Sequence, residues 1–171
     1  MIEIKDKKDC AGCTACTEIC PKKCILMKPD EEGFLYPVVD KNRCVECNAC
    51  NMVCPIQNPI TEEEKPQKAY LVQHCDEKVR LDSSAGGAFT AIATVVLQRG
   101  GVVFGAAYDE NFHVQHTYVE AVNELKRFRN SKYVQSDMGD CFRQVRDFLR
   151  SGRWVCFSGT PCQIEGLSRF L

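Results

Sequence analysis

Two helices are predicted by the pattern of apolar residues in the second half of the chain. Apolar side chains recur at the i, i+3, i+4, i+7, i+8 spacing of one helix face at Phe89, Ile92, Ala93, Val96 and Leu97. Gly100-Gly101 ends this helix. A second amphipathic helix is predicted over 139–149 and closes at Gly152, with an apolar side made of Cys141, Phe142, Val145, Phe148 and Leu149.

Continuous apolar runs predict strands around these helices, over 69–74, 102–108, 112–119 and 154–157. The run over 102–108 has the character of a strand buried on both faces. Residues 123–128 indicate a short helix, and a last helix follows 158–163 and reaches Leu171 without a cap. We therefore expect 69–171 to be a partial α/β domain, with helices on a small mixed sheet, in a fragment of a longer protein.

The first sixty residues have shorter apolar segments. Ile25–Met27 and Tyr36–Val39 predict a hairpin across Glu31–Gly33, and Ile2–Ile4 predicts an edge strand. The polar, acidic stretch over 61–68 predicts a surface linker. This arrangement predicts a small α+β domain over 1–60, followed by the linker and the α/β part.

Composition narrows the class of protein. The 171 residues carry 22 basic and 23 acidic side chains, which gives no electrostatic reason to expect nucleic acid or an anionic membrane as a partner. The N-terminus has no apolar leader, and the longest apolar run, Phe89–Leu97, is too short for a membrane span. We expect a cytoplasmic protein, in which 13 cysteines are better explained by metal or redox chemistry than by disulfides.

The cysteines form a repeat. The segment CAGCTACTEICP, from Cys10, recurs as CVECNACNMVCP from Cys44, an offset of 34 residues. Three closely spaced thiolates can wrap one 4Fe–4S cluster, while the fourth points to a neighbouring cluster, as in two-cluster ferredoxins. We assign Cys10, Cys13, Cys16 and Cys54 to the first cluster, and Cys20, Cys44, Cys47 and Cys50 to the second.

Other features of the repeat fit this ferredoxin-like domain. Pro21 and Pro55 follow the fourth cysteines, and the small residues Gly12, Ala15 and Ala49 let backbone N–H groups approach cluster sulfurs. Because so small a domain buries little apolar surface, the bound clusters would contribute much of the free energy of folding. Two structural zinc sites are the alternative, which the third cysteine and the Cys-Pro ending of each segment disfavour.

The remaining cysteines have simpler interpretations. Cys24 lies outside the quartets and is a packed thiol or an alternative ligand. Cys75, Cys141 and Cys156 occupy apolar positions and are expected in the core.

Two loops in the second half are candidate sites. Ser83–Gly87 precedes a helix, where free N–H groups suit a phosphate, although a serine there can simply be a cap. Ser158–Gln163 follows a strand at an end where α/β sheets bind ligands, and Pro161 suits the first position of the next helix. Cys162 would lie in its first turn, where the helix dipole favours a thiolate, or be a small buried residue.

Three blocks, SSAGG, SKYVQS and SGTPCQ, occur in this order, and with their flanks they resemble the N-terminal catalytic domain of the coenzyme F-420 hydrogenase/dehydrogenase beta-subunit family over about 69–171. Bacterial members of this family often carry an N-terminal two-cluster ferredoxin domain. The resemblance implies a flavoprotein that passes electrons between iron–sulfur clusters and FAD, for a deazaflavin coenzyme or another low-potential partner.

By this resemblance, the flavin contacts would be Ser84, Gly86, Gly87, Lys132, Tyr133, Gly159, Thr160, Pro161 and Gln163. Lys132 would suit a phosphate. Cys162 resembles the family cysteine that helps to hold a further cluster, whose other cysteines would lie in a C-terminal half absent from this sequence.

Three hypotheses follow. The first is an iron–sulfur flavin oxidoreductase with a redox partner protein or reduced ferredoxin and an unidentified small-molecule substrate. The second is a pure electron carrier whose residues 69–171 dock a partner. The third is a structural zinc protein.

Overall fold

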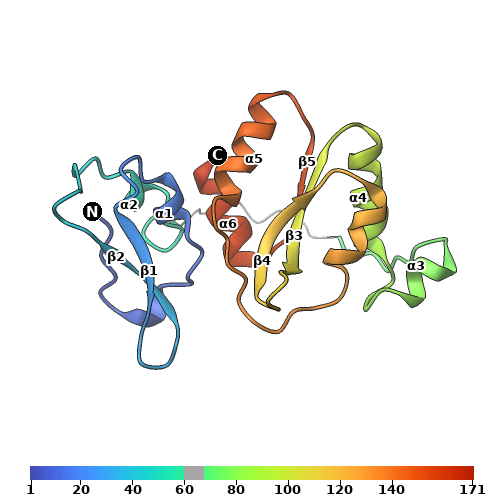
Figure 1. The fold of residues 1–171 in the computed structure, drawn as a ribbon, viewed down its shortest axis with the longest axis horizontal. Helices are drawn as coiled ribbons and strands as arrows, with labels where there is room; N and C mark the ends of the chain where they lie inside the picture. The colour runs from blue at the N-terminus through green and yellow to red at the C-terminus, as the bar shows by residue number, and fades with distance from the viewer. Residues whose placement is uncertain (60–67) are drawn as a thin grey trace. The chain divides into compact units, whose positions relative to one another are not determined.

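The computed structural model describes residues 1–59 and 68–171, so the predicted linker over 61–68 lies outside the described residues except for Lys68. The chain divides into two compact units, Met1–Glu63 with Gly159–Leu171, and Glu64–Ser158. Figure 1 shows the elements of both. Residues 159–171 thus group with the cysteine-rich unit, whereas the sequence had assigned them to the domain over 69–171.

The first unit consists of short helices and one hairpin. The helices are η1 (Lys7–Asp9), α1 (Ala15–Ile19), α2 (Ala49–Met52) and α6 (Pro161–Phe170), and α6 packs against α1. Strands β1 (Ile25–Pro29) and β2 (Leu35–Val39) pair antiparallel, which confirms the predicted hairpin. In the turn between these two strands, Asp30 Oδ1 accepts hydrogen bonds from the N–H groups of Glu32 and Phe34, both at 3.0 Å.

The predicted edge strand over Ile2–Ile4 is wrong, because these residues have no strand pairing. The N–H of Ile2 instead donates to Cys50 Sγ at 3.1 Å. The Ile2 side chain is buried beside Cys20, Ile25 and Cys54. Contact with the cysteines therefore replaces a sheet hydrogen bond.

The second unit is built on a three-stranded mixed sheet in the order β4-β3-β5. Strand β3 (Val102–Tyr108) lies in the middle, antiparallel to β4 (Val114–Val119) and parallel to β5 (Val155–Phe157). The helices are α3 (Glu77–Leu81), α4 (Ala88–Gln98), the 3₁₀ helix η2 (Val122–Phe128) and α5 (Cys141–Arg150). The sequence did not predict α3, and the other elements named here agree with those expected. The described chain as a whole is α+β.

The core of the second unit lies on both faces of β3, as its continuous apolar run predicts. On one face, Val103 and Ala107 pack with the α4 and η2 residues Ala93, Leu97, Leu125 and Phe128. On the other face, Phe104 is fully buried against the rings of Tyr118, Phe148 and Phe157. Gly105 permits the close approach of Phe128, since a Cβ there would lie 2.9 Å from its ring.

Two expectations for the start of this unit are wrong. Residues 69–74 form no strand, and Tyr70, Leu71 and Val72 are exposed. Their backbone is used to hold the following loop, because the N–H of His74 donates to the carbonyl of Gly86 at 2.6 Å. Cys75 is exposed rather than in the core, because the chain turns there into α3, whose cap Asp76 accepts from the N–H of Lys78.

The other two cysteines of the second unit lie as their apolar positions suggested, to different degrees. Cys141 is buried and Cys156 is half-buried. No helix within 1–59 and 68–171 combines the length and apolar character that a bilayer span requires. The cellular location stays a prediction.

We expect Phe104→Ala to destabilise the second unit by about 3–5 kcal/mol, because it removes a fully buried ring from between three aromatic neighbours. Trp154, the only tryptophan of the chain, lies beside β5 and reports on this unit in urea unfolding followed by fluorescence. The matched control is Phe112→Ala, at a ring that is 83% exposed. Equal midpoints for the two variants would contradict this account of the core.

Candidate iron–sulfur centres and cofactor loops

The two cysteine segments share one backbone conformation. Gly12 and Thr14 have φ of +64° and +65°, and Glu46 and Asn48, at the same places in the second segment, have φ of +52° and +63°. Helices α1 and α2 then begin at the corresponding residues Ala15 and Ala49. The left-handed residues turn N–H groups towards sulfur, so that Gly12 donates to Cys10 and Ala15 to Cys13. The repeat in the sequence is therefore also a repeat in structure.

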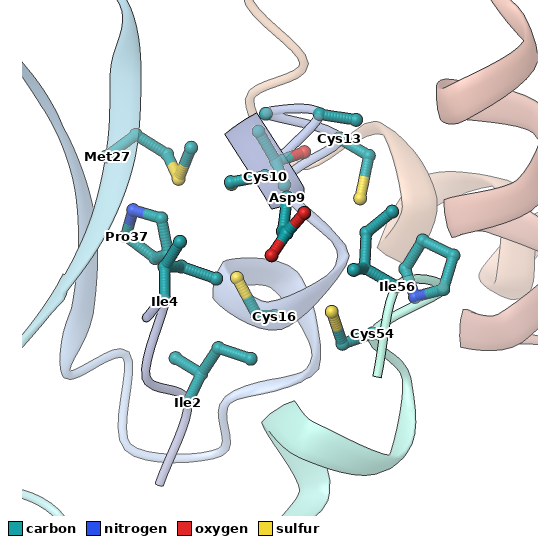
Figure 2. Close-up of a pocket in the computed structure, with 14 residues that line it drawn as sticks. Ile2, Ile4, Asp9, Cys10, Cys13, Cys16, Met27, Pro37, Cys54 and Ile56 are labelled. Carbon is teal, nitrogen blue, oxygen red and sulfur yellow. The ribbon is translucent and has the colours of Figure 1, made fainter. Parts of the chain in front are cut away.

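The first hollow is lined by cysteines from both segments. It measures about 390 Å³ and is bordered by Cys10, Cys13 and Cys16 of the first segment and by Cys54 of the second. Figure 2 shows the sulfur atoms of Cys13, Cys16 and Cys54 directed into the same space. The other walls are mainly apolar, made of Ile2, Ile4, Met27, Pro37 and Ile56. The structure thus brings together the four residues assigned to the first cluster.

The second hollow has the reciprocal lining. It measures about 350 Å³ and is bordered by Cys44, Cys47 and Cys50, by Cys20 of the first segment, and by Cys24, which lies outside both segments. In the described ranges 1–59 and 68–171, no three His, Cys, Asp or Glu side chains converge closely enough for one metal ion. The thiols instead surround two spaces. The assignment of individual ligands stays a prediction.

Burial controls the protonation of the first set of thiols. It raises the pKa of Cys10, Cys13 and Cys16, that of Cys16 to about 12, while N–H donation partly offsets this at Cys10 and Cys13. Binding of a positively charged iron–sulfur core would therefore release protons from these thiols, since the ligands are thiolates.

Cys24 lies beside the second set. Its Sγ is 3.4 Å from Cys20 Sγ, and its side chain is 3% exposed. Burial would raise the pKa of Cys20, but N–H groups of Cys24, Lys22 and Lys23 and the Cys24 thiol bond to its sulfur and together lower it. Burial raises the pKa of Cys24. Cys24 is therefore a packed thiol in contact with Cys20.

In the second unit, the SSAGG block contacts the residue that precedes the SKYVQS block. Ser84 Oγ donates to Asn130 Oδ1 at 2.8 Å, just before Ser131-Lys132-Tyr133. The SSAGG loop and the end of η2 line an open hollow bordered by Leu81, Asp82, Ser83, Ser84, Lys126, Arg129 and Asn130, and no residue of 131–136 borders it. Gly86 and Gly87 have φ of +60° and +80°, and Gly87 caps the N-terminus of α4 without a side chain. A Cβ at Gly86 would lie 2.8 Å from the carbonyl oxygen of Val72, so the conformation and the space both favour glycine.

Lys132 and Tyr133 are placed differently from each other. Lys132 Nζ donates to the carbonyls of Arg127, Arg129 and Asn130 at 3.0, 2.8 and 3.2 Å, at the end of η2. Burial lowers its pKa. Its donors are thus directed to the backbone in this structure, and the ring of Tyr133 is 95% exposed.

The SGTPCQ block follows β5 and leads into α6. Its residues from Gly159 onward belong to the first unit. Thr160 and Gln163 form a capping box, in which Gln163 Oε1 accepts from the N–H of Thr160 at 2.9 Å. Pro161 occupies the first helical turn, as expected. Cys162 is half-buried, with its Sγ 3.1 Å from Thr160 Oγ1.

Sequence reasoning missed His116, a buried residue of β4. One ring nitrogen lies 2.7 Å from Ser136 Oγ of the SKYVQS block, and the other lies 3.0 Å from the carbonyl oxygen of Ser158. The ring stacks on Phe157, and burial lowers its pKa. His116 therefore holds two blocks in place from inside the sheet. The only sequence signal for this role was that His116 lies two residues after Val114 in the predicted strand, so that both side chains point to the same face.

Comparison with known proteins bears on the first unit. The family model of the 4Fe-4S dicluster domain matches residues 9–58. No curated protein matches the chain. Residues 9–58 are thus ferredoxin-like, and the match supports bound iron–sulfur clusters and a role in electron transfer.

We expect the second unit to lose stability as the pH falls below about 6.5, because unfolded His116 binds a proton there and the buried, folded ring resists it. This contribution of His116 is fully present above that pH and is lost as the pH falls through the lowered pKa of the folded state. Urea unfolding followed by Trp154 fluorescence at pH 7.5 and 5.5 measures it. His116→Gln should show a smaller loss than wild type, whereas His113→Gln, at an exposed ring, should behave like wild type. Parallel pH profiles for wild type and His116→Gln would refute this.

Proposed function

We propose that the chain is an iron–sulfur flavoprotein oxidoreductase whose residues 1–60 hold two 4Fe–4S clusters and whose residues 69–171 contribute to a FAD site. The observation that carries the proposal is the reciprocal grouping of the eight cysteines. Each hollow takes three cysteines from one segment and the fourth from the other. This is the arrangement of two-cluster ferredoxins, and it does not follow from two independent four-cysteine zinc segments.

The residues around both hollows fit a cluster. The first hollow offers four thiols around a space and the second offers the four of the repeat together with Cys24, and both have mostly apolar walls. Inward N–H groups, such as those of Gly12 and Ala15, donate to the sulfurs and can stabilise negative charge there. A bound cluster would exchange single electrons. The chain's own part is to hold it, to limit water and to set its potential through burial and N–H donation.

The FAD part of the proposal rests on the loops of the second unit. The N-terminus of α4 presents backbone N–H groups, and Ser84, Lys126 and Arg129 border the adjacent hollow. Such a set suits a phosphate. FAD would accept and donate electrons in pairs or singly, and these residues would bind its phosphates and orient it. Lys132 would take part only if its bonds to the three carbonyls opened.

The finer assignments follow the family resemblance. Gly159, Thr160, Pro161 and Gln163 would contribute further flavin contacts, and Cys162 would help to hold a third cluster with cysteines outside this sequence. Electrons would pass to or from coenzyme F-420 or another low-potential partner, with reduced ferredoxin or another redox protein on the other side, in the cytoplasm.

A pure electron carrier is the second candidate. The engagement of Lys132 with backbone carbonyls and the exposure of Tyr133 favour it, because neither residue forms part of a closed cofactor pocket among the described residues. In this case the second unit would dock a partner and bind no flavin.

Iron analysis of the anaerobically purified chain tests the cluster assignment. We expect about eight iron atoms per chain, about four in Cys20→Ser, and about eight in Cys24→Ser, since Cys24 is a packed neighbour and not a ligand. Electron paramagnetic resonance of the reduced proteins should show one cluster lost only in Cys20→Ser. Zinc in place of iron, or equal losses in both variants, would overturn the assignment.

Titration with FAD separates the oxidoreductase from the carrier. We expect saturable quenching of flavin fluorescence by the full chain and about tenfold weaker binding by Ser84→Ala, because a hydrogen bond to a charged phosphate contributes about 1.5 kcal/mol. Ser151→Ala, whose hydroxyl donates to the carbonyl of Phe148 in α5, is the control and should bind like wild type. Absence of quenching by wild type would leave the carrier as the function.

A further inference from the structure

Helix α6 presents one buried face to the cysteine-rich unit. Gln163, Gly166, Leu167 and Phe170 are buried, at the i, i+3, i+4, i+7 spacing of one helix side. Ser168 is exposed. The buried face packs against α1, the helix that follows the first cysteine loop.

Gly166 lies directly against a predicted cluster ligand. A Cβ added there would be 3.1 Å from Cys13 Sγ, 3.2 Å from Cys13 Cβ and 3.5 Å from Ala15 Cβ. The first two distances are tighter than ordinary contacts, so the backbone of α6 approaches Cys13 as closely as a residue without a side chain permits. Glycine inside a helix is less stable than alanine, so this position needs a packing reason, and Cys13 supplies one.

Cys162 lies one helical turn before Gly166 and shares its side of α6. Its thiol is held by the Thr160 hydroxyl, and Pro161 and the capping box fix the start of the helix. The start of α6 is therefore fixed one turn before the residue that contacts Cys13.

This contact is specific to one of the two hollows. Helix α6 lines neither hollow itself, but Cys13 borders the first hollow and not the second. The three atoms nearest to a Cβ at Gly166 belong to Cys13 and Ala15, both of the first segment.

We propose that helix α6 is a wall behind the first cluster, in which Gly166 is a positioning residue that seats the helix on Cys13, keeps water from that sulfur and sets the potential of the first cluster alone. This inference rests on the proposed assignment of Cys13 to a cluster. It adds α6, which lies more than a hundred residues away in sequence, to the machinery of that cluster.

The direction of the effect follows from charge. A cluster gains one negative charge on reduction, and burial disfavours the more charged state. If α6 moves away from Cys13, water reaches the sulfur and stabilises the reduced state. The potential of the first cluster should then rise, while that of the second stays the same.

The test is a redox titration of the anaerobically purified full chain followed by electron paramagnetic resonance, with Cys10→Ser and Cys47→Ser used to assign the two signals. Gly166→Ala should raise the midpoint potential of the first cluster and leave the second unchanged. Ser168→Ala, the same final residue on the exposed face of the same helix, should change neither. Iron content verifies that the first unit of each variant is folded and loaded, and Trp154 fluorescence verifies that the second unit is folded.

Leu167→Ala is the second variant, in case Gly166→Ala does not hold iron. It removes a buried side chain from the face of α6 that packs against α1, which loosens the helix beside Cys13, so the first cluster's potential should again rise and the second's should not. Unchanged potentials in the loaded variants, or equal shifts of both clusters, would overturn the role of α6. A wild-type chain without iron–sulfur signals would instead refute the proposed function.

Discussion

Buried thiols replace much of the hydrocarbon core between the two cysteine segments, and the structure of this part of the first unit depends on that constraint. Its buried cluster comprises Ile2, Cys20, Cys24, Ile25, Cys50 and Cys54, so only two of these six side chains are hydrocarbon. So little apolar surface cannot offset the conformational entropy of about sixty residues. The free energy of folding must come largely from what the thiols bind. Cys54 of the second segment lines the first hollow, and Cys20 of the first segment lines the second. Each bound cluster would therefore link both segments and stabilise their packing.

Local spacing predicted much of this arrangement. The repeat at 34 residues anticipated equal loop conformations at Gly12 and Glu46 and equal helix starts at Ala15 and Ala49. The hairpin, the central strand β3 and helices α4 and α5 also followed from periodicity. These features depend on neighbours in the chain, or on burial that a strand shows by its own composition. Sequence patterns carry such information directly.

The errors arose where the outcome depends on a distant partner. Residues 69–74 have a strand-like composition, but a strand needs a ladder, and their backbone bonds to the loop at Gly86 instead. Because that strand does not form, Cys75 is exposed and not buried as expected. The role of Lys132 stays a prediction, because a motif shows which residue is present and not that its ammonium donates to nearby carbonyls. His116 and Gly166 were missed for the same reason, since their partners Ser136 and Cys13 are remote in sequence.

The two units therefore differ in what stabilises them, and this affects how any measurement on the whole chain is interpreted. The second unit has an aromatic core around Phe104 that needs no cofactor, whereas the first has thiols in place of hydrocarbon. Two such units have no reason to unfold together, so a single two-state free energy is not defined for the chain. Trp154 reports on the second unit, and iron–sulfur signals report on the first. Helix α6 belongs with the first unit although it follows the second in sequence, so its stability should follow iron binding and not the aromatic core.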